Sequence, residues 1–127
     1  MRGGVNRGIG MGFLMPSTTL FGLGERETRD LNLKTDGTLY EMWAFDSPHE
    51  PNHLNGLYGN MPYVQGIGHE TASGLAWLNS AHTWSWMVSP ESSHADTDIF
   101  MVSETGALEV FLFSSAVKQK IGMLNRN

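Results

Sequence analysis

The segment from His49 to His53 reads His-Glu-x-x-His, the signature in which two histidines bind zinc and a glutamate acts as general base. That chemistry requires residues at positions i and i+4 to share one face of a helix, with Glu50 beside them. Pro51 stands in the middle of the segment, where proline removes a helical hydrogen bond and costs about 3 kcal/mol. We therefore interpret the segment as a solvated loop, reject a metallopeptidase, and predict no metal site.

Two pairs of carboxylates have a spacing that could serve glycosidic bond hydrolysis. Glu25 and Glu27, and likewise Asp96 and Asp98, are two residues apart, which on a strand places both side chains on one face. Glycosidases use two carboxyl groups about 5–9 Å apart. Acidic pairs at loop and strand edges are mostly solubility features, and the spacing alone has little specificity, so we assign no catalytic residue.

Glycines and tryptophans give two further candidate sites. The segments GIGMGF (8–13) and FGLGER (21–26) contain Gly-x-Gly but do not complete a nucleotide-binding fingerprint, so we predict tight turns and no cofactor. Trp43, Trp77, Trp84 and Trp86 could stack on sugar C–H faces. Large aromatic residues in strands belong to the core more often, so we expect each of them in the core.

The composition limits the possible partners. The chain has 127 residues, one domain or part of one, with no cysteine and a formal net charge of −5. All eight Lys and Arg lie at or before Lys34 or at or after Lys118, and ten carboxylates lie between these positions. This charge distribution disfavours nucleic acid and anionic membrane surfaces, and no apolar run is long enough to span a bilayer. An uncharged ligand such as a sugar is compatible with it.

Short apolar runs separated by Gly, Pro, Asn and Ser predict an all-β chain, an antiparallel β-sandwich. In Thr83–Ser89 the alternation of side chains predicts a half-buried strand. The segment SETGALEVFLF (103–113) reads as a hairpin with Gly106 at the turn, and the tail has a weak helical pattern. We predict strands at 38–45, 57–67, 74–81, 83–89, 97–104 and 107–115.

This strand set is small for a closed sandwich, so we expect an incomplete one. Such a molecule leaves unpaired edges and uncovered apolar faces such as Trp84 and Trp86.

Five segments together resemble the N-terminal sandwich of glycoside hydrolase family 31, the α-glucosidases, most closely the glucosidase II branch. The match covers roughly residues 11–115. The segments, in the family's order, are FGLGER (21–26), LYEMWAFD (39–46), GLYGNMPYV (56–64), GLAWLNSA (74–81) and SETGALEVFLF (103–113).

The resemblance implies a galactose-mutarotase-like sandwich that packs against a catalytic (β/α)₈ barrel in the same chain, with both catalytic aspartates in that barrel. It implies an N-terminal segment at 1–19, the sandwich portion at 20–115 and a divergent tail at 116–127. These 127 residues alone are then expected to be inactive. α-Glucosides are the implied substrates of the whole enzyme, and the endoplasmic reticulum lumen is the location implied by the glucosidase II branch.

The resemblance carries one site residue over. In several family members, the Asp after the Tyr-x-x-Trp strand contacts sugar hydroxyls at the mouth of the barrel's pocket, and Asp46 stands at that place. Its carboxylate can accept two hydrogen bonds from a diol, although an Asp also commonly caps a turn such as the one into Ser47-Pro48. Ala44 and Gly56 depart from the family's usual Asn. The alternative is a stand-alone β-sandwich that binds carbohydrate or a protein partner.

Overall fold

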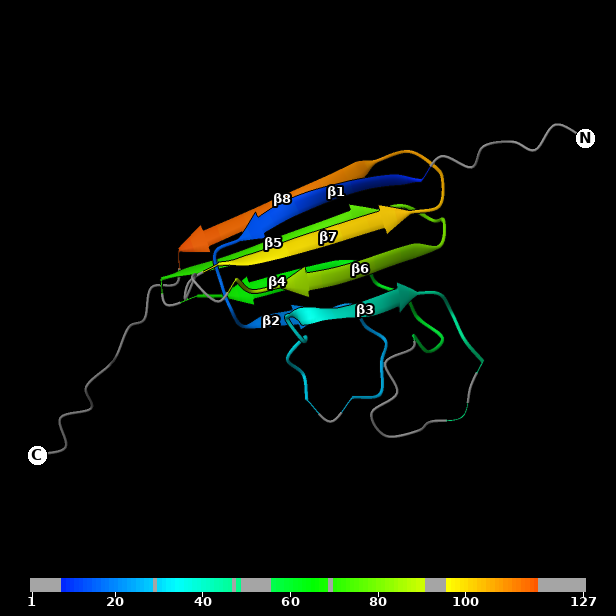
Figure 1. Cartoon of the computed structure of the whole chain (residues 1–127), viewed down its shortest axis with the longest axis horizontal. Helices are drawn as coiled ribbons and strands as arrows, with labels where there is room; N and C mark the ends of the chain where they lie inside the picture. The colour runs from blue at the N-terminus through cyan, green and yellow to red at the C-terminus, as the bar shows by residue number, and fades with distance from the viewer. Residues whose placement is uncertain are drawn as a thin grey trace, which may run out of the picture.

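The computed structural model describes residues 8–28, 30–46, 48, 56–68, 70–90 and 96–116. In this part of the chain eight strands form two four-stranded antiparallel sheets that face each other (Figure 1). The predicted all-β antiparallel sandwich is confirmed. No helix among the described residues is long and apolar enough to cross a membrane. The strands are β1 (Ile9–Met15), β2 (Leu20–Gly22), β3 (Asp36–Met42), β4 (Tyr63–Ile67), β5 (Thr71–Leu78), β6 (Thr83–Val88), β7 (Thr97–Ser103) and β8 (Glu109–Ala116).

The first sheet has the strand order β1-β7-β6-β3 and the second has the order β2-β4-β5-β8. The hairpins β4–β5 and β6–β7 stay within a sheet, whereas the other connections cross between sheets. All six predicted strands are present with shifted ends, the largest shift being at β4, which begins at Tyr63. The strands β1 and β2 were not predicted, because glycines at Gly10, Gly12 and Gly22 disguise them as turn sequence.

The predicted hairpin around Gly106 is wrong. Gly106 does have the positive φ that the turn residue requires, at 101°. However, β7 pairs with β6 in the first sheet and β8 pairs with β5 in the second, so this turn joins the two sheets. Asn79 fixes the corner by donating from Nδ2 to the carbonyls of Thr105 and Ala107, each at 3.0 Å.

The core lies between the sheets and contains only one of the four tryptophans. Trp77 is 1% exposed and its indole N–H donates to Ser103 Oγ at 2.9 Å. The expectation of a core position is wrong for Trp84 and Trp86, which lie half-buried on the outer face of β6, and for Trp43, which is exposed. The core residues are Met15, Leu20, Leu23, Tyr40, Met42, Val64, Leu75, Trp77, Met87, Ile99 and Met101.

Polar residues occupy the inner face of β6 because they bond to one another. Thr83 and Ser103 share a hydrogen bond of 2.6 Å between hydroxyls, and Ser85 lies close to the sulfur of Met87. The predicted alternation is correct, but alternation alone does not say which of the two faces is buried. The hydrogen-bonded hydroxyls therefore lie on the inner face of β6, and the aromatic rings lie on its outer face.

Candidate functional site

The FGLGER segment (21–26) overlaps the end of β2, and its second and third residues have positive φ. Gly22 has φ 128° and Leu23 has φ 50°. A Cβ atom at position 22 would lie 2.1 Å from the carbonyl oxygen of Tyr63, so only glycine fits there. The close approach lets Leu23 enter the core and lets its N–H donate to the same carbonyl at 2.8 Å. The turn is thereby locked against the strand β4.

A ladder of irregular hydrogen bonds continues this contact beyond the strands. The N–H of Met61 donates to Gly24 O at 2.7 Å, and the N–H of Glu25 donates to Gly59 O at 2.7 Å. The N–H of Leu57 donates to Glu25 O at 2.9 Å. The Glu25 carboxylate also accepts from the Gly59 N–H at 3.1 Å. Two of the five family-like segments, FGLGER and GLYGNMPYV, are therefore one structural unit.

Arg26 joins this unit to β3. Its Nε donates to Leu23 O at 2.8 Å and its Nη2 donates to Glu41 O at 2.5 Å, while the guanidinium lies 5.3 Å from the centre of the Tyr40 ring. Burial lowers the pKa of Arg26 to about 10. Burial also raises the pKa of Tyr40. Arg26 thus holds the turn against the LYEM strand.

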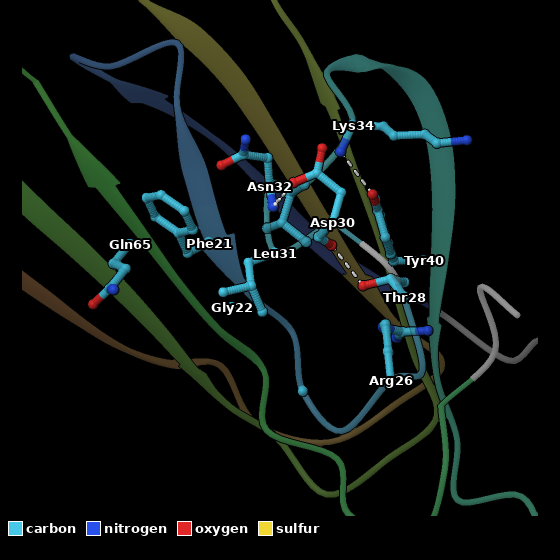
Figure 2. Close-up of a pocket in the computed structure, with 12 residues that line it drawn as sticks. Phe21, Gly22, Arg26, Thr28, Asp30, Leu31, Asn32, Lys34, Tyr40 and Gln65 are labelled. Atoms are coloured by element: carbon cyan, nitrogen blue, oxygen red, sulfur yellow. Dashed lines mark hydrogen bonds between the residues drawn. The ribbon is translucent and has the colours of Figure 1, made fainter. Parts of the chain in front are cut away.

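A cavity of about 580 Å³ lies beside Arg26, between the second sheet and the loop that leads to β3 (Figure 2). Hydrogen bonds join parts of its lining: the Thr28 hydroxyl donates to Asp30 O at 2.7 Å, and the Asn32 N–H donates to Asp30 Oδ1 at 2.9 Å. The Lys34 N–H donates to the Tyr40 hydroxyl at 2.7 Å. These bonds shape the loop, and we assign the cavity no ligand.

Asp46 lies where the chain leaves the LYEMWAFD segment, and it is exposed. Its Oδ1 accepts a hydrogen bond from the Tyr58 hydroxyl at 2.7 Å, and the Phe45 N–H donates to Leu57 O at 3.0 Å beside it. The pKa of Tyr58 is raised, most by its hydrogen bond to Asp46 and next by the negative charge of Asp46. The charge of Glu25 raises it further. Among the described residues, Asp46 Oδ2 has no hydrogen-bond partner.

Three aromatic rings stack on the first sheet, where β3 ends and β6 begins. The His82 ring lies between Trp43, at 4.8 Å, and Trp84, at 4.1 Å between ring centres. His82 Nε2 is 2.7 Å from Glu41 Oε1. Trp43 is 50% exposed, so one side of the stack faces solvent.

A second cavity, of about 330 Å³, adjoins the stack of Trp43 and His82. Asn60, Asn79 and Ser80 contribute polar groups to its lining, beside the apolar Met42 and Pro62. We call the assembly of the FGLGER turn, residues 43–46 and residues 56–62 the motif end of the molecule. Chemically it offers carboxylate oxygens, a tyrosine hydroxyl and an exposed indole, which suits a neutral polyhydroxyl ligand. Its described residues provide no nucleophile–base pair.

The other predicted candidates lie elsewhere or have structural roles. Glu25 and Glu27 lie in a loop and not on a strand, so the spacing argument fails for them. Asp98 is in β7, opposite Val88 at the far end of β6 from the motif end. The segment His49–His53 lies outside the described residues. No group of three or more potential metal ligands occurs in the part of the chain that the structure describes.

Sequence reasoning missed Tyr58, which bonds to Asp46, and Arg26, which joins the turn to β3. It also missed His82. Tyr58 and Arg26 both stand inside quoted segments, so their sequence context carried the signal although their contacts could not be foreseen. The sequence gives no signal for His82, because its stacking depends on Trp43 and Trp84 being outside the core.

The fold and the motif end together define a galactose-mutarotase-like sandwich. The family model of the glycosyl hydrolase 31 N-terminal galactose mutarotase-like domain matches residues 6–85, more than half of the chain. The chain belongs to this family. A search of curated protein sequences finds no match.

Solved structures agree on the fold. The glucosidase II alpha subunit with bound Glc1Man2 superposes with a TM-score of 0.76 at 24% identity over 87% of this chain. The same subunit with bound alpha3-Glc2 superposes with a TM-score of 0.74 at 24% identity over 85% of this chain. The chain spans 14% of the length of each of these structures.

Proposed function

We propose that this chain is the non-catalytic N-terminal sandwich portion of an α-glucosidase, supporting a catalytic (β/α)₈ barrel and shaping the entrance for an α-glucoside. The observation that supports this most is the motif end itself. Three segments that are separate in sequence, and that carry the family resemblance, meet there and are tied by backbone bonds at Gly24, Glu25 and Phe45. A surface built with this much hydrogen bonding outside regular strands indicates a functional loop cluster.

Asp46 is the residue that we propose contacts substrate. Tyr58 holds one carboxylate oxygen at 2.7 Å and thereby orients the group on an otherwise exposed loop. The other oxygen is available to a sugar hydroxyl, and a hydrogen bond to a charged group contributes about 1.5–3 kcal/mol. The role is one of positioning and recognition, because the bond-breaking groups are supplied by the barrel.

The proposal is tested by grafting residues 8–116 in place of the corresponding segment of a glucosidase II alpha subunit. We expect the graft to hydrolyse an α-glucoside, whereas the 127-residue chain alone does not. An insoluble or inactive graft that is rescued by the original segment would count against the proposal.

The alternative, a stand-alone carbohydrate-binding sandwich, has its own readout. Titration calorimetry of the 127-residue chain with maltose or nigerose should give no binding heat. Saturable heat that Trp43→Ala abolishes would favour the binding module, because Trp43 is the exposed indole of the motif end.

A further inference from the structure

His82 is the one histidine among the residues that the structure describes, and its ring contacts three side chains. Between ring centres it lies 4.1 Å from Trp84, at an interplanar angle of 27°, and 4.8 Å from Trp43, at 45°. Its ring nitrogen Nε2 is 2.7 Å from Glu41 Oε1. The His82 side chain is 18% exposed, so these neighbours replace most of its water.

The register of β3 with β6 explains why these side chains meet. Glu41 is opposite Trp84 in the antiparallel pairing. Continuing that register by two residues sets Trp43 opposite His82, in agreement with the contact between their rings. Side chains two residues apart on a strand share one face, so all four lie on the outer face of the first sheet. The cluster is therefore fixed by strand pairing.

The charged groups that surround His82 on this face are carboxylates. Glu41 comes from β3. Glu104 follows β7, stands opposite His82 by the register of β7 with β6, and donates its backbone N–H to His82 O at 2.9 Å. Asp46, the charged residue of the segment after β3, accepts its hydrogen bond from Tyr58. Such groups attract an imidazolium ring by charge and do not so attract a neutral one.

The cation that contacts the same strand lies on the opposite side of it. The Arg26 guanidinium is 5.3 Å from the centre of the Tyr40 ring and donates to the sulfur of Met42. Tyr40 and Met42 alternate with Glu41 along β3 and belong to the core. Arg26 is therefore on the inner face, and β3 separates it from His82.

The contact between His82 Nε2 and the Glu41 carboxylate suits the protonated ring. Nε2 is buried and has no well-aligned hydrogen bond to any described residue, so charge dominates its 2.7 Å contact with Glu41 Oε1. A ring nitrogen without a proton and a carboxylate oxygen are both acceptors, and they repel each other. A ring with both nitrogens protonated is a cation, which the carboxylate and the faces of both indoles attract.

We propose that protonation of His82 holds Trp43 against β6, so that this residue of the motif end is fixed at acidic pH and released as the pH rises. Histidine is the side chain that ordinarily changes charge between about pH 5 and 8. Trp43 lies one residue beyond the end of β3 and is 50% exposed, whereas Trp84 lies within β6, so Trp43 is the ring that moves. The inference concerns contacts within the chain and does not depend on the proposed function.

Acrylamide quenching of tryptophan emission tests the proposal. Trp86→Phe provides the background, and Trp77 is buried, so the accessible indoles are then the two that contact His82. We expect the quenching constant to be about two- to fivefold larger at about pH 8 than at about pH 5.5, the factor that a cation over an exposed indole provides. Equal quenching constants at the two pH values overturn the proposal.

The matched control is His82→Phe in the same background, which keeps an aromatic ring but cannot be protonated. Its quenching constant should be the same at both pH values, and a pH dependence that persists in it contradicts the proposal. Glu41→Gln remains informative if His82→Phe unfolds the chain, because it removes only the charge beside Nε2. It should reduce the ratio of the two constants, and more than Glu104→Gln does. An unchanged ratio in Glu41→Gln would refute the role of charge in holding Trp43.

Discussion

The motif end and the β8 edge differ in how their backbone hydrogen-bonding groups are satisfied. At the motif end the chain bonds to itself irregularly, with Glu25 using its N–H, its carbonyl and its carboxylate to hold residues 57–59. At β8 a regular strand of eight residues leaves one edge without a partner among the described residues. The difference teaches that local specificity lies in the turns here, whereas β8 is regular and pairs on one edge only among the described residues.

The largest expected effect is at the turn that starts the motif end. Gly22→Ala places a Cβ 2.1 Å from Tyr63 O and forces alanine to a φ of 128°, so we expect a loss of about 3 kcal/mol or more in the free energy of unfolding. Urea titration measures it. Gly37→Ala separates the two causes, because Gly37 has φ 85° with nothing within 4 Å of its added Cβ. Equal losses at both positions would show that the contact with Tyr63 is unimportant.

Arg26→Met tests the link between the turn and β3. It removes the guanidinium donors from the carbonyls of Leu23 and Glu41, and we expect a loss of about 2–3 kcal/mol in unfolding free energy by chemical denaturation. Lys34→Met is the control, since Lys34 lines the same cavity and its hydrogen bond to the Tyr40 hydroxyl uses the backbone N–H. If the two variants were equally stable, Arg26 would not be the link between the turn and β3.

Truncating a side chain on β8 should cost less stability than truncating one in the core. Leu75→Ala should cost about 2–5 kcal/mol because it leaves a cavity in the core. Leu112→Ala, at the paired position on β8, should cost less than about 1 kcal/mol in dilute solution, because the side chain is 70% exposed. Similar losses for both, measured at concentrations where the chain is monomeric, would mean that β8 is covered by the chain itself.

The sequence predicted the class of fold and the segments of the motif end well. It predicted less well how the strands are connected and which face of each strand is buried. Alternation identified β6 as half-buried, but it could not tell that hydroxyls at Thr83 and Ser85 would face inward. Gly106 was correctly assigned a positive φ, but a turn of this kind serves a hairpin and a sheet-to-sheet corner equally well. The side-chain bonds of Asn79 decide between them, and these join residues 26 and 28 positions apart.

Asp46 illustrates the same limit for the site. Family order placed it beside the Leu-Tyr-Gly segment, whereas its bond to Tyr58, twelve residues away, depends on how the two loops fold together. Its role in binding substrate stays a prediction.

The smallest effect concerns the proton of Tyr58. The hydrogen bond and charge of Asp46 raise its pKa above the ordinary 10, so Asp46→Asn should lower that pKa. Because the folded chain holds this proton more tightly than the unfolded chain, stability is lost as pH rises through the raised pKa, and less so in Asp46→Asn. Phenolate absorbance during alkaline titration, with Tyr58→Phe to assign the signal, measures the shift. An unchanged titration would mean that the two groups do not interact in solution.

The central claim is that the motif end presents Asp46 to the substrate of an α-glucosidase barrel, and steady-state kinetics of the grafted enzyme test it most directly. We expect Asp46→Asn to lower kcat/KM for an α-glucoside by about ten- to a hundredfold, the equivalent of one charged hydrogen bond. Asp98→Asn, the same substitution on β7 opposite Val88 and away from the motif end, should leave kcat/KM unchanged. Equal kinetics for Asp46→Asn and the parent graft would contradict the account.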